Sequence, residues 1–409
     1  MSGMAIRVTR PILARLRLAS QALLGSSFRS PAEAVGWMTA MQGQDFPGAL
    51  HSVALRVPGA TREDVRAALD GGGIVRSWPM RGTLHLTAAE DMGWIMALTS
   101  ERIITGQAAR HRQLEIAPPD VEAVRDVALK MLDDVGSASR EELQQAFESV
   151  GQDTGGQRGI HLLWLLNLTG TLVQGPVVGA KQHFVRADKW IPNPRRLERG
   201  EAVAELTLRY FRSHGPATLA DFTWWSKLTL KDARAGLDRV NGQLVELTAD
   251  GPTGSARQRA GAFDGSARTR TASGHGLGSG QGLGSGRRSS SPDAPVPPSY
   301  WLSKETADLL DDVPGSRSLL LLPGFDEFLL GYADRTAALD PGHRDLIVPG
   351  GNGMFKPTIV AGGRVIGTWR KAAKGNGAGV EPLPFAELTA AQNRGFTRAA
   401  TAYARILAP

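Results

Sequence analysis

A pattern of helices followed by strand-forming residues constrains the fold of this chain more than any other feature. The pattern occurs three times along the chain. In the first occurrence, apolar residues recur at helical spacing over residues 11–24, and Ser30 is expected to cap a second helix over residues 31–41, with proline at its first position. A third helix is expected from Thr61, and residues 74–86 place β-type residues on both sides of a short turn. Helices followed by a two-stranded hairpin are the order of a winged helix.

The second occurrence covers residues 119–176. A helix is expected through Leu132, and Ser139 followed by Glu142 forms the signature of a capping box at the start of the next helix. A third helix at residues 159–168 and a strand near residues 171–174 complete a second helix-turn-helix unit with a wing.

The third occurrence begins at Glu201. An amphipathic helix is expected to end at residues 213–216, Thr218 caps a helix through Trp225, and residues 230–240 form a candidate recognition helix. Because no residue-level repetition accompanies the three occurrences, the repeat is one of architecture.

The composition changes sharply between residues 250 and 298, where Gly, Ser, Arg and Pro dominate. We expect a disordered insertion without essential chemistry there, and we prefer a tolerated loop over non-specific phosphate contacts by its arginines. After it, a helix near residues 303–311, short strands at residues 319–370 and a helix at residues 388–406 predict a small β-barrel-like domain with a closing helix.

The expected fold class is therefore α+β, with three tandem winged-helix domains followed by the barrel-like domain. The expected bounds, in chain order, are three winged helices at residues 1–115, 116–198 and 199–250, the insertion at 251–298, and the barrel-like domain with its closing helix at 299–409.

Composition limits the classes of function. Lys and Arg outnumber Asp and Glu by 47 to 40, a moderate excess that is compatible with a polyanionic partner. The chain has no cysteine, which excludes thiolate metal sites and cysteine nucleophiles. The eight histidines lack ligand spacing and no nucleotide-binding glycine loop is present, so we expect no metal and no cofactor. The apolar runs are too short to span a membrane, and we expect a cytoplasmic, nucleoid-associated monomer.

Three segments resemble a winged-helix DNA-binding family that includes the AlkZ-type and YcaQ-like DNA glycosylases. They are Met41-Gln42-Gly43-Gln44-Asp45, Arg81-Gly82-Thr83-Leu84-His85 and residues 322–332, which read LPGFDEFLLGY. Residues 214–225 and 353–370 support the resemblance, which covers nearly the whole chain except the insertion.

The resemblance implies three tandem winged helices in a C-shaped scaffold, a C-terminal β-barrel and a Gln-x-Gln motif, here Gln42-Gly43-Gln44. The family usually has a residue with a side chain at the middle position. The resemblance makes Gln42 and Gln44 the catalytic candidates. The alternative is that both side chains only hydrogen-bond the end of a loop. Residues two apart on a helix point to nearly opposite sides, so the two glutamines converge only if the helix has ended by Met41.

Glutamine suits one kind of glycosidic hydrolysis. A purine that is positively charged by alkylation at N7 is already a good leaving group, so the enzyme mainly has to orient water and stabilise an oxocarbenium-like sugar. Amide oxygens can do both, because they accept hydrogen bonds and carry partial negative charge. An amide is a poor base, which favours labile cationic lesions over neutral bases.

Arg81, His85 and Asp45 are the DNA-binding candidates. Arg81 belongs to the hairpin tip or its shoulder, where it would meet a duplex, and His85 points to the same strand face. Asp45 can supply a carboxylate beside the motif. The alternatives are a core histidine at position 85 and an intradomain salt bridge at Arg81.

Two further pairs have structural interpretations. Asp326 and Glu327 are adjacent on an expected strand, which predicts one structural carboxylate and one that faces solvent. Trp224 and Trp225 are expected in the core of the third winged helix.

We therefore expect a monofunctional DNA glycosylase that hydrolyses the N-glycosidic bond of N7-alkylated purines in duplex DNA, with interstrand crosslinks as further substrates, in base excision repair of alkylation damage. No lysine that would form a Schiff base is evident, so strand cleavage is not expected. The alternative is a non-catalytic winged-helix protein that regulates or organises DNA.

Overall fold

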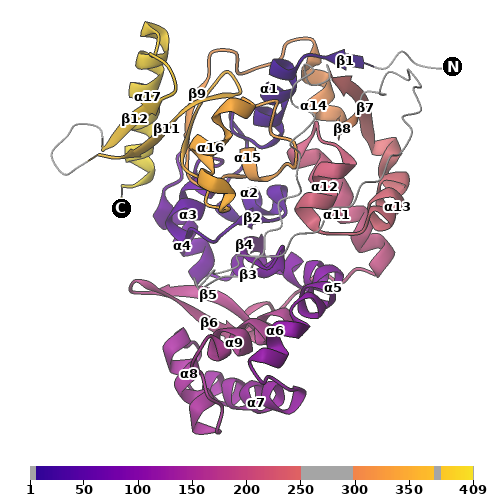
Figure 1. Ribbon diagram of the computed structural model, residues 1–409, viewed down its shortest axis with the longest axis vertical. Helices are drawn as coiled ribbons and strands as arrows, with labels where there is room; N and C mark the ends of the chain where they lie inside the picture. Colours follow the sequence, from indigo (N-terminus) through magenta and orange to yellow (C-terminus); the bar gives the residue numbers. More distant parts are fainter. Residues whose placement is uncertain (1–5, 250–297, 373–378, 409) are drawn as a thin grey trace, which may run out of the picture.

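The computed structural model describes residues 6–249, 298–372 and 379–408. The described chain mixes helices with three sheets (Figure 1). Its helices at residues 1–115 are α1 (Arg10–Ser20), α2 (Pro31–Met38), α3 (Phe46–Ala54), α4 (Arg62–Asp70), α5 (Ala89–Gly106) and α6 (Ala108–Gln113), and its strands there are β1 (Ile6–Val8), β2 (Met41–Gln42), β3 (Ile74–Met80) and β4 (Thr83–Ala88).

The first helix–hairpin unit consists of α2, α3 and α4 followed by β3 and β4. The expected helix caps are present. The Ser30 side chain accepts a hydrogen bond from the backbone N–H of Glu33, and Thr61 forms a capping box with Asp64. Apolar residues of the three helices pack with Ile74 and Leu86 of the hairpin into one core.

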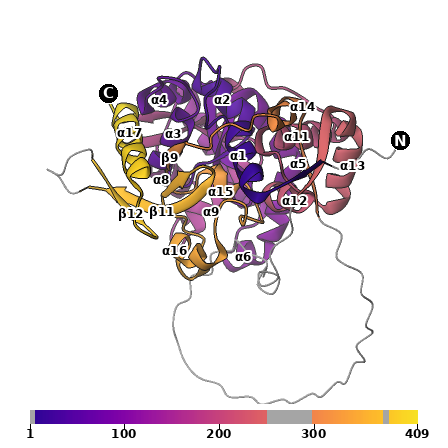
Figure 2. The same cartoon turned by 90° about the horizontal axis from the view of Figure 1, so that it is seen from above.

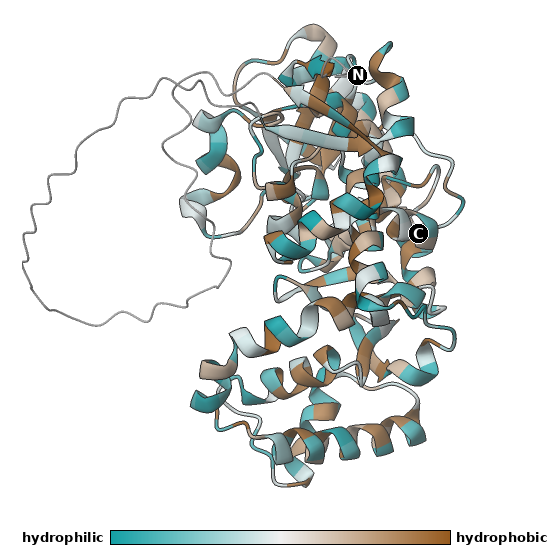
Figure 3. Ribbon diagram, turned by 90° about the vertical axis from the view of Figure 1, so that its right-hand side faces the viewer, coloured by the Kyte–Doolittle hydropathy of each residue, from teal (hydrophilic) through white to brown (hydrophobic). Residues whose placement is uncertain are grey.

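The second unit lies at the lower end of Figure 1 and is built the same way. Its elements are α7 (Pro118–Val135), α8 (Arg140–Ser149), α9 (Arg158–Leu168), β5 (Leu172–Val178), β6 (Lys181–Arg186) and the short α10 (Ala187–Trp190). The capping box at Ser139 is present. Figure 3 shows hydrophilic and hydrophobic residues alternating along the helices at this end of the molecule, as expected for helices that bury one face.

The hairpins of the first two units belong to one sheet. β3 pairs antiparallel with β5 at Arg76 and Gln174, which gives the strand order β2-β4-β3-β5-β6. The motif strand β2 is one edge of this sheet.

The third unit consists of α11 (Arg199–His214), α12 (Leu219–Ser226), α13 (Leu230–Val240), β7 (Leu244–Ala249) and β8 (Ser299–Ser303). β7 and β8 pair antiparallel although residues 250–297 separate them. The expected insertion lies outside the described residues, between the two strands of this hairpin. β1 pairs parallel with β7, and α1 packs against the same strands through Leu13 and Leu16.

The C-terminal part contains a four-stranded antiparallel sheet of order β12-β11-β10-β9. Its elements are α14 (Lys304–Ala307), β9 (Leu319–Leu322), α15 (Glu327–Leu330), α16 (Arg344–Ile347), β10 (Thr358–Ala361), β11 (Arg364–Lys371), β12 (Val380–Pro384) and α17 (Ala390–Ile406). Helix α17 packs on the sheet through Phe396 and Tyr403, and Figures 1 and 2 both show it beside β11 and β12. In the described chain this sheet is not closed, so the expected barrel-like domain is not confirmed. The division into three winged helices and the expected domain bounds stay predictions.

None of the described helices is long and apolar enough to cross a membrane.

Candidate active site

The Gln42-Gly43-Gln44 segment lies beyond the end of a helix. α2 ends at Met38, and Thr39 has φ of 67°, which turns the chain into the short strand β2. β2 pairs antiparallel with β4, so that Gln42 lies opposite His85. The two glutamines are therefore free of the helical geometry that would separate their side chains.

Both glutamine side chains reach the first residues of β4. Gln42 Nε2 donates to Thr83 Oγ1 at 3.4 Å, and the backbone N–H of Leu84 donates to Gln44 Oε1 at 3.3 Å. Gln42 is buried with 8% of its surface exposed, whereas Gln44 is exposed. Gln42 Oε1 also accepts the N–H of Gly43 at 3.1 Å. Because an amide oxygen has two lone pairs, each side chain keeps one for a further donor such as water.

Both the backbone N–H and the backbone carbonyl of Gly43 form hydrogen bonds. Its N–H donates to Leu84 O at 2.7 Å, and its carbonyl accepts Arg76 Nε–H at 3.0 Å. Its backbone is outside the left-handed region, and a Cβ built there would lie 3.4 Å from Arg76 Nε and from the backbone of His85. The segment thus keeps a conformation that other residues can adopt, although the room for a side chain is tight.

Arg76 joins the motif to the second hairpin. Its Nη1 donates to Gln174 Oε1 and to Gln182 Oε1, each at 2.8 Å. Burial lowers the pKa of Arg76 to about 10, so the side chain remains charged at neutral pH.

Asp45 begins α3 and is exposed. Its side chain makes no capping hydrogen bond but lies over the first turn, where a Cβ on Gly48 would collide with its carboxylate. A carboxylate thus stands in solvent directly after the glutamine motif.

Arg81 and His85 form a buried pair. The turn between β3 and β4 consists of Arg81 and Gly82, with φ of 56° and 67°, and it directs the Arg81 side chain inward. Arg81 Nη2 donates to His85 Nε2 at 2.9 Å, and His85 Nδ1–H donates to Thr83 O at 2.8 Å. Burial and the charge of Arg81 lower the pKa of His85 to about 3, so the imidazole is neutral. Neither side chain lies on an open hairpin tip.

Glu327 lies behind the motif and is 1% exposed, which corrects the expectation that one carboxylate of the Asp326-Glu327 pair faces solvent. The two residues begin α15 and are not on a strand, so strand alternation does not apply to them. Glu327 Oε1 accepts the backbone N–H of Gln42 at 3.0 Å, and Oε2 accepts Trp225 Nε1–H at 3.1 Å.

Glu327 keeps its negative charge although it is buried. Burial alone would raise its pKa, but the neighbouring ring of His214, 3.6 Å away, and the guanidinium of Arg81, 4.0 Å away, outweigh burial and lower the pKa to about 2. A permanent buried anion thus fixes the backbone at Gln42.

Asp326 anchors α15 to the first unit. Arg56 donates to both of its carboxylate oxygens, at 2.9 and 3.1 Å, and Ser52 Oγ donates to Oδ2. Gln21 of the turn after α1 accepts from Arg56 and donates to Glu327 O. These bonds hold α15 where Glu327 meets the motif.

Trp225 is fully buried, as expected for core, but Trp224 is only half-buried. Arg81 lies 5.1 Å and Arg335 5.0 Å from the centroid of the Trp224 ring. Trp224 packs against the core of the third unit and also borders the site, so only Trp225 lies fully inside that core.

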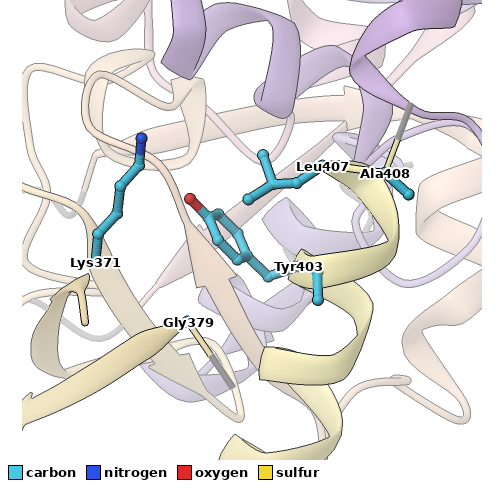
Figure 4. A pocket seen from close by; sticks show the side chains of 6 residues that line it. Lys371, Gly379, Tyr403, Leu407 and Ala408 are labelled. Atoms are coloured by element: carbon cyan, nitrogen blue, oxygen red, sulfur yellow. The ribbon is translucent and has the colours of Figure 1, made fainter. Parts of the chain in front are cut away.

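A pocket of about 290 Å³ lies elsewhere, between α17 and the end of β11. Figure 4 shows Lys371 and Tyr403 pointing toward one another across it. None of the predicted site residues lines this pocket, so it is separate from the glutamine motif. Across the residues that the structure describes, no group of three acidic or histidine side chains could hold a metal ion.

Sequence reasoning did not find Glu327 and Arg76 as parts of this site. The signal for Glu327 was its place in the segment at residues 322–332, but a helix start at that point was not recognised. Arg76 gave no local signal, since its partners are Gly43, directly after β2, and glutamines on β5 and β6.

Known proteins are similar to this chain in sequence and in fold. A family model described as DNA glycosylase AlkZ-like matches residues 35–406. The interstrand DNA cross-link repair glycosylase of Streptomyces sahachiroi is 24% identical over 356 residues, which cover 83% of this chain and 82% of that protein. The solved structure of the DNA glycosylase AlkZ from the same organism has a TM-score of 0.74 at 21% identity and covers 98% of this chain and 97% of that one, which shows a shared fold. Since the family model spans most of the sequence, the chain belongs to the AlkZ-like family of DNA glycosylases.

Proposed function

We propose that this protein hydrolyses the N-glycosidic bond of N7-alkylated purines in duplex DNA, crosslinked purines included, and leaves an abasic site. The observation that carries the proposal is that Gln42 and Gln44 both hydrogen-bond the first two residues of β4, Thr83 and Leu84, each with a lone pair left on its amide oxygen. The name of the Streptomyces relative supports crosslinked DNA as a substrate.

In the proposed mechanism the two amide oxygens orient a water molecule and face the positive charge that develops on the sugar. Glutamine oxygens fixed before the reaction stabilise such charge without reorganisation. The buried Glu327 holds the Gln42 backbone in place and adds negative potential behind it. The alkylated purine leaves without strong protonation, so no general acid is required at the base.

The experiment is incubation of the purified protein with duplex DNA that contains N7-methylguanine, scored for abasic sites. Gln42→Ala and Gln44→Ala should each lower the rate by about 100-fold, the size typical of a lost electrostatic contact in a transition state. Gln243→Ala, at an exposed glutamine of the turn before β7, is the matched control and should keep the wild-type rate.

Base release that neither substitution affects contradicts the assignment of the glutamines. No release by the wild type, with salt-sensitive DNA binding retained, favours the non-catalytic DNA-binding alternative. We also propose that the protein associates with the nucleoid and is a monomer. Light scattering of the free protein tests the monomeric state.

A further inference from the structure

Five side chains form a continuous series of cation–ring contacts, ended by one ring–ring contact, beside the glutamine motif. In order they are Arg81, Trp224, Arg335, Phe355 and Phe325, and we call them the cation–aromatic ladder. Arg81 and Arg335 lie 5.1 and 5.0 Å from the Trp224 ring centroid, Arg335 lies 5.1 Å from the Phe355 ring, and the two phenylalanine rings are 6.1 Å apart.

The ladder begins at the candidate active site and continues toward solvent. Its inner end is Arg81, which donates to His85 opposite Gln42. Beyond Arg81, the side chains of Trp224, Arg335 and Phe355 are each partly exposed. These three side chains are therefore partly accessible to a ligand.

Arg335 has no direct ion-pair partner among the described residues, although the carboxylates of Asp221 and Asp334 lie near enough to act on its charge. Of the charged groups that act on Arg335, Asp221 pairs with Arg17 and Arg81 pairs with Glu327. No ion pair in the described part of the chain includes Arg335. Its Nε donates to Leu329 O at 2.7 Å, and the Nη groups have no hydrogen-bond partner among the described residues.

Burial is the main effect on this cation. It lowers the pKa of Arg335 to about 10; the carboxylates of Asp221 and Asp334 act against this shift, and the charges of Arg344 and Arg81 add to it. Lys227 Nζ lies 5.9 Å from the Trp224 ring. A cluster of like charges gains stability when an anion binds among them. Two aromatic rings border the guanidinium, and its Nη groups can form two parallel hydrogen bonds to an anion.

We propose that Arg335, clamped between Trp224 and Phe355, binds a phosphodiester of the DNA strand next to the lesion nucleotide. This inference rests on the proposed function, because it places the phosphate beside the glutamine motif. Guanidinium groups bind phosphate oxygens through two N–H donors, and such contacts fix the register of a strand without reading its bases. The ladder thereby sets the position of the damaged nucleotide relative to Gln42 and Gln44.

The test is the affinity of Arg335→Gln for an undamaged duplex, measured by fluorescence anisotropy over a range of salt concentrations. Loss of one phosphate contact should lower affinity by about tenfold at low salt and reduce the slope of log affinity against log salt by about 1. Arg125→Gln, at an exposed arginine of α7 that has its own carboxylate neighbour, should leave both values unchanged.

A second pair of variants tests the clamp. Trp224→Leu should weaken binding, since the guanidinium loses its platform, and Trp224→Phe should restore part of the affinity. A lower melting temperature for Arg335→Gln with an unchanged salt slope would show a packing role alone and overturn the proposal, as would unchanged affinity.

The outcomes for the two proposals are distinguishable. Gln42→Ala should keep the wild-type salt slope, because it removes no phosphate contact. If the wild type releases no N7-methylguanine but Arg335→Gln still lowers the salt slope, the proposed reaction fails and the phosphate site stands. If base release depends on the glutamines while the slope does not depend on Arg335, the phosphate site fails alone.

Discussion

At the residue scale, Glu327 connects three parts of the molecule that the glutamine motif needs. It accepts hydrogen bonds from Gln42 of the first unit and Trp225 of the third, and it lies on α15 of the C-terminal part. A buried carboxylate without such donors would be neutral. The buried Glu327 is therefore charged only when all three parts are packed together.

Glu327→Gln should destabilise the fold and slow base release. The amide keeps the shape, but it turns one N–H donor toward Gln42 or Trp225 and leaves the buried Arg81 without its counter-charge. We expect a loss of about 3 kcal/mol in the free energy of unfolding, measured by urea titration. Glu122→Gln on the exposed face of α7 is the control. Full stability in the Glu327 variant would show that the carboxylate is not charged in the native protein.

Buried histidines make stability depend on pH. Burial is the main cause that lowers the pKa of both His51 and His85 to about 3, whereas in the unfolded chain each is near 6.5. Below pH 6.5 the unfolded chain therefore binds protons that the native protein does not, and stability falls as the pH falls. Each histidine should contribute a slope of about 1.4 kcal/mol per pH unit.

The measurement is the urea midpoint between pH 7.5 and pH 5. His51→Asn removes one titrating group. The slope of stability against pH should therefore fall by the contribution of one histidine, about 1.4 kcal/mol per pH unit. An unchanged slope in that variant would mean that His51 is protonated, or exposed, in the native state.

At the element scale, the turn between β3 and β4 determines where Arg81 points. Two consecutive residues with positive φ form the kind of two-residue turn that matches the twist of a hairpin. Glycine fits this conformation, whereas Arg81 adopts it at a cost, which the contacts to His85 and Glu327 offset.

Gly82→Ala should therefore lower stability by about 1 kcal/mol and reduce base release, because strain in the turn displaces Arg81. The surroundings of Gly82 are open, so the effect arises from φ of 67° and not from a collision. Gly242→Ala is the control, since that glycine also has open surroundings but an ordinary backbone. Thermal melting compares the two, and equal values would exclude strain at the turn.

Local elements could be predicted from the sequence because their signals are local. The caps at Ser30, Thr61 and Ser139 and the hairpin around Arg81 are confirmed. The parallel pairing of β1 with β7 carries no local signal. Nor could the sequence show that Asp326 begins a short helix, because four residues show no periodicity.

The candidate site was predictable only in part for the same reason. The family motif indicated Gln42 and Gln44, whose contacts with Thr83 and Leu84 lie within the first unit. The contacts of Glu327 with Gln42 and Trp225 join residues 285 and 102 positions apart, and these form only once the units pack.

At the scale of the whole molecule, the site depends on how the units are joined. α1 packs against the third unit, while Gln21 after it bonds Arg56 and α15, so the N-terminal segment ties the first, third and C-terminal parts together. Buried arginine–carboxylate pairs at Arg17–Asp221 and Arg56–Asp326 lie along this junction. Such pairs fix one arrangement of the parts, because an alternative arrangement would leave a buried charge unpaired.

The hairpin of the third unit offers a test of the whole arrangement. Thr248 of β7 lies opposite Ser299 of β8, so the two ends of residues 250–297 are as close as neighbouring strands. Replacing these residues with a turn of about four residues that contains Asn-Gly should leave the hairpin register intact. Closing a loop of roughly 50 residues costs about 2 kcal/mol more entropy than closing one of four, so the shortened protein should be more stable by up to that amount.

The same variant removes the six arginines at positions 257, 259, 268, 270, 287 and 288. If these only add non-specific attraction to DNA, the salt dependence of binding becomes shallower while single-turnover release of N7-methylguanine at saturating protein keeps its rate. A rate that falls at saturation, with the urea midpoint unchanged or higher, would mean that residues 250–297 take part in the reaction itself. Because the saturating condition removes any effect of weaker binding, the experiment separates attraction of DNA from chemistry at Gln42 and Gln44.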